Sequence, residues 1–99
     1  MIRGTTPTLV FTLPFEAQQL EEAYISFAQN GKVVLEKTLS DCTSHQNTLT
    51  VRLTQEETLK LKTDVNTEIQ IRARTIAEEA VASDIIRVPT GRILKDGVI

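Results

Sequence analysis

The residues best suited to metal or nucleophilic chemistry lie in one short stretch, Asp41-Cys42-Thr43-Ser44-His45. Cys42 and His45 are the single cysteine and the single histidine of the chain. A closed zinc site needs four ligands, and a catalytic one needs three ligands and a water molecule. Asp41 would have to be the third ligand, and a Cys–His nucleophile would still lack a group that orients the base. We therefore expect a polar loop here, with no metal and no cofactor.

Three pairs of adjacent glutamates are the only candidates for paired catalytic carboxylates: Glu21-Glu22, Glu56-Glu57 and Glu78-Glu79. Glycosidases use two carboxyl groups that face each other across a cleft, whereas adjacent residues of a strand point to opposite faces. Helix caps and solvated turns explain these pairs more simply. The sequence also lacks the glycine-rich phosphate-binding patterns and the G-x-S-x-G motif. We therefore expect a protein that is not an enzyme.

Basic residues on the predicted strands are the only candidates for a phosphate-binding stripe. They are Arg52, Arg72, Arg74 and Arg87, and the acidic residues that can neutralise them from neighbouring strands are Glu36, Glu68 and Asp84. The net charge is −2 and the chain has only four aromatic residues, three Phe and one Tyr. Proteins that bind single-stranded nucleic acid need a basic groove with aromatic stacking platforms. The composition therefore predicts no nucleic-acid partner.

The beginning of the chain, MIRGTTPTLVFTLPF, carries polar residues and prolines where a signal peptide needs a continuous apolar run. No segment approaches the length of a membrane span, so we expect no membrane partner. A single cysteine cannot form an internal disulfide, which favours folding in a reducing cytoplasm.

Alternation of apolar and polar residues with a period of two dominates the chain and is typical of half-buried strands. The segments that show it, or that have strand-like composition, are Thr8 to Leu13, residues 23–27, Lys32 to Leu39, Thr48 to Leu53, Glu68 to Ile76 and Ala80 to Val88.

The connections between these segments have recognisable turn signals. Asn30-Gly31 tolerates positive φ at two successive positions and predicts a type I′ hairpin. Thr54-Gln55-Glu56-Glu57 matches a capping box, which predicts a short helix from Gln55 to about Leu61. Glu16 to Leu20 is expected to form one helical turn, and the polar run Ser40 to Asn47 is expected to be a loop.

Together these elements predict an all-β fold, an immunoglobulin-like antiparallel β-sandwich of six or seven strands with one short helical turn near residues 55–61. The chain has the length of one domain, residues 1–99, in which residues 89–99 form a C-terminal tail or an edge strand. A small open barrel is the competing architecture. The cysteine and tryptophan pattern of antibody domains is absent.

A sandwich without a chemical site would act through sheet edges and uncovered apolar residues. The candidate interaction surface consists of outward-facing members of the strands and the end of the tail: Val10, Val34, Ile76, Ile86, Val88, Val98 and Ile99. The alternative is that the second sheet or the tail buries some of them. The alternative function is a carbohydrate-binding module for a host cell-surface glycan, for which Tyr24 is the sole ring available to stack on a sugar.

Several stretches carry a resemblance that covers nearly the whole chain: MIRGTTPTLVFTLPF, ISFAQNGKVVLEK, DCT followed by NTLTVRLTQEETL, ASDIIRV and the closing LKDGVI. They resemble short proteins encoded in prophages of Gram-positive gut bacteria, among tail or baseplate genes. The group is also similar in fold to N-terminal immunoglobulin-like modules of phage baseplate and fibre proteins. The resemblance implies a non-enzymatic, phage-derived structural or assembly protein. Its partners would be tail or baseplate proteins or further copies of itself, in the virion or the bacterial host cytoplasm.

Overall fold

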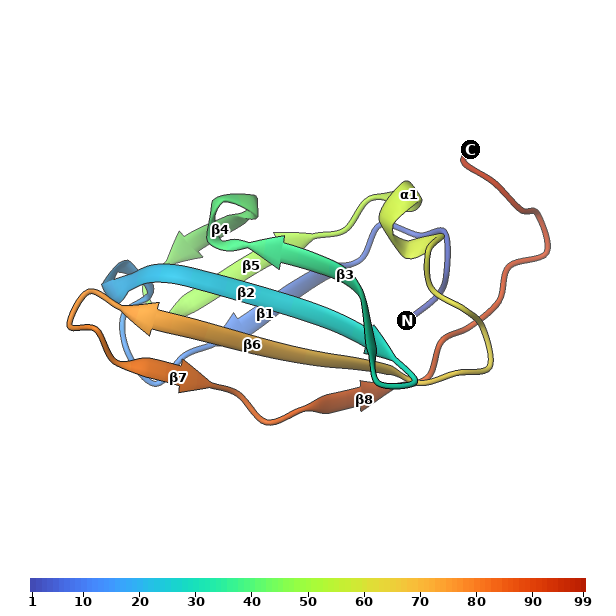
Figure 1. Cartoon of the computed structure of the whole chain (residues 1–99). Helices are drawn as coiled ribbons and strands as arrows, with labels where there is room; N and C mark the ends of the chain where they lie inside the picture. Colours follow the sequence, from blue (N-terminus) through green and yellow to red (C-terminus); the bar gives the residue numbers. More distant parts are fainter.

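Two antiparallel β-sheets, packed face to face, form the body of the protein in a computed structural model that describes all residues, 1–99 (Figure 1). The three-stranded sheet has the order β1 (Thr8–Thr12), β5 (Thr48–Arg52), β4 (Cys42–His45). The larger sheet has the order β3 (Lys32–Thr38), β2 (Leu20–Gln29), β6 (Thr67–Thr75), followed on the flank of β6 by β7 (Ala80–Ala82) and β8 (Ile86–Val88). The prediction of an all-β sandwich is confirmed.

The strand order is that of the immunoglobulin fold without its first strand. When β1 to β6 are lettered B, C, C′, D, E and F, and β7 with β8 is lettered G, the two sheets become B-E-D and C′-C-F-G. Strand A of that fold pairs with strand B, which is β1 here. The segment that precedes β1 runs elsewhere, since Ile2 forms a parallel bridge with Gly91 near the C-terminal end of the chain. One edge of β1 is consequently left open.

The core lies between the sheets and is built from the inward positions that the alternation predicts. Ile25 and Phe27 of β2 and Leu49 of β5 are completely buried. They are opposed across the sandwich because every second residue of each strand points to the same side. Burial of apolar side chains of this kind is the main stabilising contribution, about 25 cal/mol per Å² of apolar surface.

The predicted hairpin at Asn30-Gly31 is confirmed. Asn30 has φ 52° and Gly31 has φ 77°, the left-handed values that a type I′ turn requires, and Gln29 faces Lys32 across the turn. A bulge shifts the register of this pair: Phe27 pairs with Leu35 and Ala28 with Val33, so β3 has one extra residue between them.

Helical structure is limited to three short pieces. α1 (Gln55–Thr58) begins at the predicted capping box, in which Thr54 Oγ1 accepts from Glu57 N–H at 3.2 Å and Glu57 Oε1 accepts from Thr54 N–H at 2.8 Å. The helix ends earlier than predicted and continues as turns to Leu61, whose side chain reaches the core. Single 3₁₀ turns, η1 (Ala17–Gln19) and η2 (Leu39–Asp41), connect strands. None of these helices is long and apolar enough to cross a membrane.

Eight strands are present instead of six or seven, for two reasons. Cys42–His45 was expected to be a loop, but it pairs with β5 through a turn in which Gln46 has φ 52°. The segment 80–88 was expected to be one strand, but Ser83 interrupts it. The Ser83 hydroxyl accepts from Ile71 N–H at 3.1 Å and donates to Asp84 O at 2.9 Å, so the side chain replaces part of the backbone ladder.

Candidate interaction site

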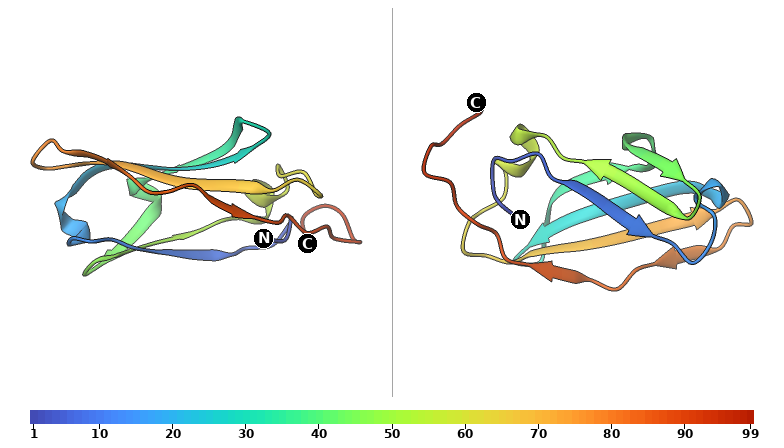
Figure 2. Two further views of the ribbon diagram at one scale, coloured as in Figure 1. Left: turned by 90° about the horizontal axis from the view of Figure 1, so that it is seen from below. Right: turned by 180° about the vertical axis from the view of Figure 1, so that it is seen from behind.

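An apolar groove of about 500 Å³ opens on one side of the sandwich, between β1 and the β7–β8 flank. Its walls come from both sheets: Val10 and Phe11 from β1, Ile71 from β6, and Val81 and Ile86 from β7 and β8. Ten of its thirteen lining residues are hydrophobic. Figure 2 shows from behind that the β7–β8 flank projects beyond β1. This is the side on which the immunoglobulin fold has its first strand.

The open edge of β1 presents free hydrogen-bonding groups along the groove. Leu13 N–H donates to Asn47 O at 2.7 Å, and Leu53 N–H donates to Pro7 O at 3.0 Å, so the odd-numbered residues of this segment face β5. Successive residues of a strand point their backbone groups to opposite sides. The amides and carbonyls of Thr8, Val10 and Thr12 therefore face away from β5, toward the open edge.

The other edges of the two sheets have features that oppose pairing with another chain. β3 carries Lys32, Glu36 and Lys37 and adjoins the bulge, while β4, β7 and β8 contain only three or four residues each. β1 contains no charged residue, no proline and no bulge. It is the least protected edge of the molecule.

The predicted interaction residues lie in three places. Val10, which is 61% exposed, and Ile86 both line the groove, and they are the two that the structure brings together. Ile76 is exposed at the turn between β6 and β7. Val98 and Ile99 are exposed in the C-terminal tail, away from the groove (Figure 2).

Two of the predicted residues are less exposed than the others. Val88 packs partly against the core, because it pairs with Thr67, whose side chain is buried on the inner face of β6. Val34 is half-buried, and Val33 takes the outward position instead. The reason is the bulge, which pairs Ala28 with Val33 and Phe27 with Leu35 and leaves Val34 between them. Strict alternation cannot locate a bulge.

Leu94 is the most exposed large apolar residue of the chain, at 93%, and the sequence reasoning missed it. The signal that could have found it is the composition of residues 92–99, which carry four aliphatic residues in a segment without strand partners.

Tyr24, the candidate for sugar stacking, lies on the outer face of the larger sheet and is 38% exposed. Its hydroxyl donates to the carboxylate of Glu22. This hydrogen bond raises the pKa of Tyr24 above its usual value, and the negative charge of Glu22 adds to the effect. Two shallow hollows, of about 230 and 300 Å³, adjoin the ring and include Arg72 and Glu36 among their walls.

The arginines do not form a continuous cationic stripe. Arg87 lies 3.0 Å from Glu68 across the β6–β8 pair, as the cross-strand argument predicts. Arg74 lies 3.0 Å from Glu22 and 3.7 Å from Glu21. Glutamates therefore offset half of the four charges that would have to attract a phosphate backbone.

Cys42 and His45 do not converge on a common point. Because they belong to a strand and are three residues apart, their side chains point to opposite faces. Cys42 Sγ donates to Thr38 O at 3.4 Å, and burial raises the pKa of the thiol. Asp41 accepts from Thr38 N–H at 2.8 Å, and this bond lowers the pKa of its carboxyl. No group of three His, Cys, Asp or Glu side chains is close enough to hold a metal ion.

Comparisons with models of known protein families, with curated proteins and with solved structures found no match. The protein can therefore be classified only by its own structure, which is an immunoglobulin-like sandwich with an open strand edge beside an apolar groove.

Proposed function

We propose that this protein is a non-enzymatic, phage-derived structural or assembly protein that takes part in a tail or baseplate through protein–protein contacts. The observation that carries the proposal is the combination at β1 of outward backbone groups at Thr8, Val10 and Thr12 with an adjoining groove lined mainly by hydrophobic residues. Exposed edges and apolar patches of this kind mark sites of association in soluble proteins.

The mode of association that fits this surface is the addition of a strand. An extended segment that pairs with β1 gains main-chain hydrogen bonds from the edge, and its alternate side chains enter the groove. The hydrogen bonds supply affinity, and the shape of the groove supplies specificity. Val10 lies at the centre of the edge and Ile86 on the opposite wall, so both residues would be buried in the complex.

The resemblance to prophage-encoded tail and baseplate proteins supports the biological setting. In this setting the protein is made in the cytoplasm of the bacterial host and is found either there or in the virion. No step of the proposed function uses a cofactor, nucleic acid or membrane.

The test is the presence of the protein in phage particles. Particles released after induction of the bacterium that carries the gene are purified, and the protein is quantified in them by mass spectrometry. We expect a fixed copy number per tail, and loss of this incorporation when Val10→Pro removes the central outward amide. Absence of the wild-type protein from particles, and from tail intermediates in lysates, would overturn the proposal.

A carbohydrate-binding module is the second candidate, because Tyr24 is exposed beside polar side chains and two hollows. Stacking of the ring on a sugar face would carry the affinity, and Glu22 and Arg72 would offer hydrogen bonds. Calorimetric titration with cell-wall polysaccharide tests this candidate. Binding that Tyr24→Ala abolishes and Tyr24→Phe retains would favour it over assembly, while equal heats for all three proteins would exclude it.

A further inference from the structure

The two ends of the sandwich differ in charge. The longest strand, β2, follows the long axis of the molecule from Leu20 to Gln29 (Figure 1). The Cα atoms extend over 46 × 27 × 16 Å, so the ends of this axis are the smallest faces of the molecule. We call the end at Gln29 the basic end and the end at Leu20 the acidic end, after the charged side chains that lie there without an ion pair.

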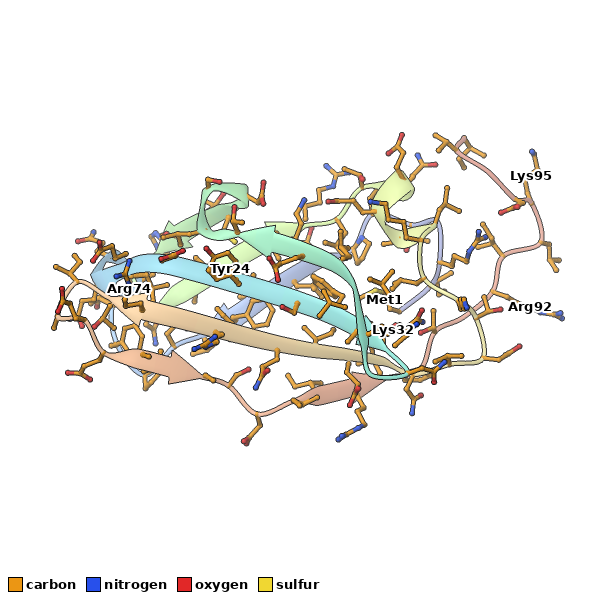
Figure 3. All side chains as sticks on the ribbon, in the orientation of Figure 1. Met1, Tyr24, Lys32, Arg74, Arg92 and Lys95 are labelled. Carbon is orange, nitrogen blue, oxygen red and sulfur yellow. The ribbon has the colours of Figure 1, made fainter.

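The side chain of Gln29 organises the basic end. Its two hydrogen bonds hold the backbone of Lys62, and Gln29 lies in register with Lys32 across the hairpin. It also donates to the buried hydroxyl of Thr90 at 3.5 Å, which brings Arg92 to the same place. Figure 3 shows Lys32 and Arg92 at this end. Three exposed cations thus gather at one end of the molecule.

The basic side chains at this end are only partly offset by acidic ones. Lys32, Lys62 and Arg92 have no ion pair. The unpaired acidic residue beside them is Asp64, whose N–H donates to Thr90 O at 3.3 Å. Two further carboxylates belong to ion pairs and cancel against their own partners, since Asp96 pairs with Arg3 and Glu68 pairs with Arg87. An excess of positive charge therefore remains.

The acidic end is formed by η1 and the turn between β6 and β7. Ile76 N–H donates to Gln19 O at 2.8 Å, which holds the turn against η1. Glu16 at the start of η1, and Glu78 and Glu79 in the turn, are exposed and have no ion pair. Three carboxylates are therefore free to meet a cationic surface.

Arg74 does not neutralise this end. Its guanidinium lies 3.0 Å from Glu22 and 3.7 Å from Glu21, so these two carboxylates already share its charge. Figure 3 shows Arg74 at the end of the molecule opposite Lys32 and Arg92. The acidic end therefore carries an excess of negative charge, and the two ends are complementary to each other.

From this distribution of charge we infer that copies of the protein associate end to end, with the basic end of one copy against the acidic end of the next. Opposite charges attract across such a contact and like ends repel, which fixes the direction of each copy. A second copy is the partner that fits, because this chain itself supplies both surfaces and places three unpaired charged side chains of opposite sign on each.

The contact is heterologous, so a ring or a filament forms according to whether the rotation between copies closes. Each end measures about 27 × 16 Å, which is less than the roughly 800 Å² per partner that a stable interface buries. Association of the pure protein is therefore weak and sensitive to salt. The contact leaves β1 and its groove free, so it goes beyond the proposed function and does not depend on it.

Sedimentation velocity of the purified full chain tests the inference over a wide range of concentration. Ionic strength is varied from about 0.01 M to about 1 M, over which the Debye length falls from about 30 Å to about 3 Å. We expect the wild type to form species larger than a monomer at low ionic strength and to dissociate as salt is added. Val10→Pro should associate as the wild type does, because it changes the groove and neither end.

Two variants reverse the charge of one end each, and all the substituted side chains are exposed, so the fold is retained. The basic-end variant combines Lys32→Glu, Lys62→Glu and Arg92→Glu. The acidic-end variant combines Glu16→Lys, Glu78→Lys and Glu79→Lys. At low ionic strength each should associate about tenfold more weakly than the wild type or worse. Circular dichroism and melting temperatures verify that both variants are folded.

A control variant carries Glu36→Lys with Asp84→Lys, which add positive charge to the middle of the molecule. Glu36 faces Ser26 in the middle of β2, and Asp84 follows Ser83, whose N–H donates to Ile71 O in the middle of β6. This variant should associate as the wild type does. A chain that carries all six end substitutions has the net charge of the wild type with its ends exchanged, so it should regain association.

The inference is refuted by a wild type that stays monomeric at the lowest ionic strength, by end variants that associate as the wild type does, or by a folded six-substitution chain that stays monomeric. Association that strengthens with salt and is lost in Val10→Pro would place the contact at the groove instead. Loss of a monomeric protein from phage particles in the basic-end variant alone would assign this end to an acidic partner protein. Self-association of a protein that is absent from particles would support this inference and overturn the proposed function.

Discussion

Lys37 Nζ lies 2.7 Å from Glu57 Oε2, and this ion pair joins β3 to α1, the helix that links the two sheets. The two side chains are only 12% and 19% exposed. Glu57 is also part of the capping box, where it accepts from Thr54 N–H. One carboxylate thus fixes both the start of the helix and its position against the larger sheet.

Removal of either partner should therefore destabilise the fold. We expect Lys37→Met and Glu57→Gln each to lower the free energy of unfolding by about 1–3 kcal/mol, because each leaves a largely buried polar group without its partner. Urea denaturation of the two single variants and the double variant measures the coupling. Asp96→Asn, which breaks an exposed pair with Arg3, is the control and should change stability by less than about 1 kcal/mol. Strictly additive losses would show that the pair is not coupled.

The Glu57 carboxylate also makes the stability of the fold depend on pH. Burial pushes the pKa of Glu57 upward, but the hydrogen bond from Lys37 and the amide of Thr54 outweigh burial, so the pKa is lowered from its ordinary value of 4.5. A carboxyl whose pKa is lower in the folded state stabilises the fold above its unfolded pKa. This contribution is lost as the pH falls below about 4.5 and through the folded pKa. We expect the melting temperature of Glu57→Gln to fall less than that of the wild type over this range. Parallel decreases would rule out Glu57 as the source.

Gly31 provides a test of the hairpin. A Cβ at this position would meet no atom within 4 Å apart from its chain neighbours, so the effect of a substitution comes mainly from the backbone angle. Gly31→Val should lower stability by roughly 1 kcal/mol or more, since φ of 77° is strained for a β-branched residue. Gly97→Val is the matched control, because Gly97 has φ 86° and open space but lies in the tail. Equal melting temperatures for the wild type and Gly31→Val would contradict the left-handed conformation of Gly31 in this turn.

Gln29 clamps the loop between α1 and β6 from the end of β2. Its side-chain amide donates to Lys62 O at 2.8 Å and its carbonyl accepts from Lys62 N–H at 2.8 Å. Gln29→Met keeps the volume and leaves both backbone groups unpaired, so we expect a loss of about 2 kcal/mol or more. Hydrogen exchange should show faster opening of the loop at Lys62. Gln18→Met, at an exposed position, should change neither quantity.

The sequence was informative wherever a local pattern fixes local structure. The alternation around Ile25 and Phe27 gave the buried face of β2, the Asn30-Gly31 pair gave the turn, and Thr54 with Glu57 gave the start of α1. Each of these depends on neighbours within a few residues. The resemblance to prophage proteins and the assembly function stay predictions.

The groove could not be predicted, because no local sequence pattern encodes it. Val10 was a candidate for exposure from its alternation, but its place above the groove depends on two long-range facts. The segment before β1 pairs at Gly91 instead of covering β1, and Ser83 breaks the last strand into β7 and β8. Likewise, Val34 is half-buried because of a bulge whose position depends on how β2 and β3 pair.

Side-chain period and turn chemistry act over a few residues, so the sequence was enough to predict most of the inward-facing positions, the Asn30-Gly31 turn and an all-β fold. Strand pairing joins residues that are far apart in the chain, so the structure was needed to show that the strands form two packed sheets and that one edge of β1 stays open. The width of one sheet relative to the other is a property of the whole assembly of strands, and it is this difference that leaves a place beside β1.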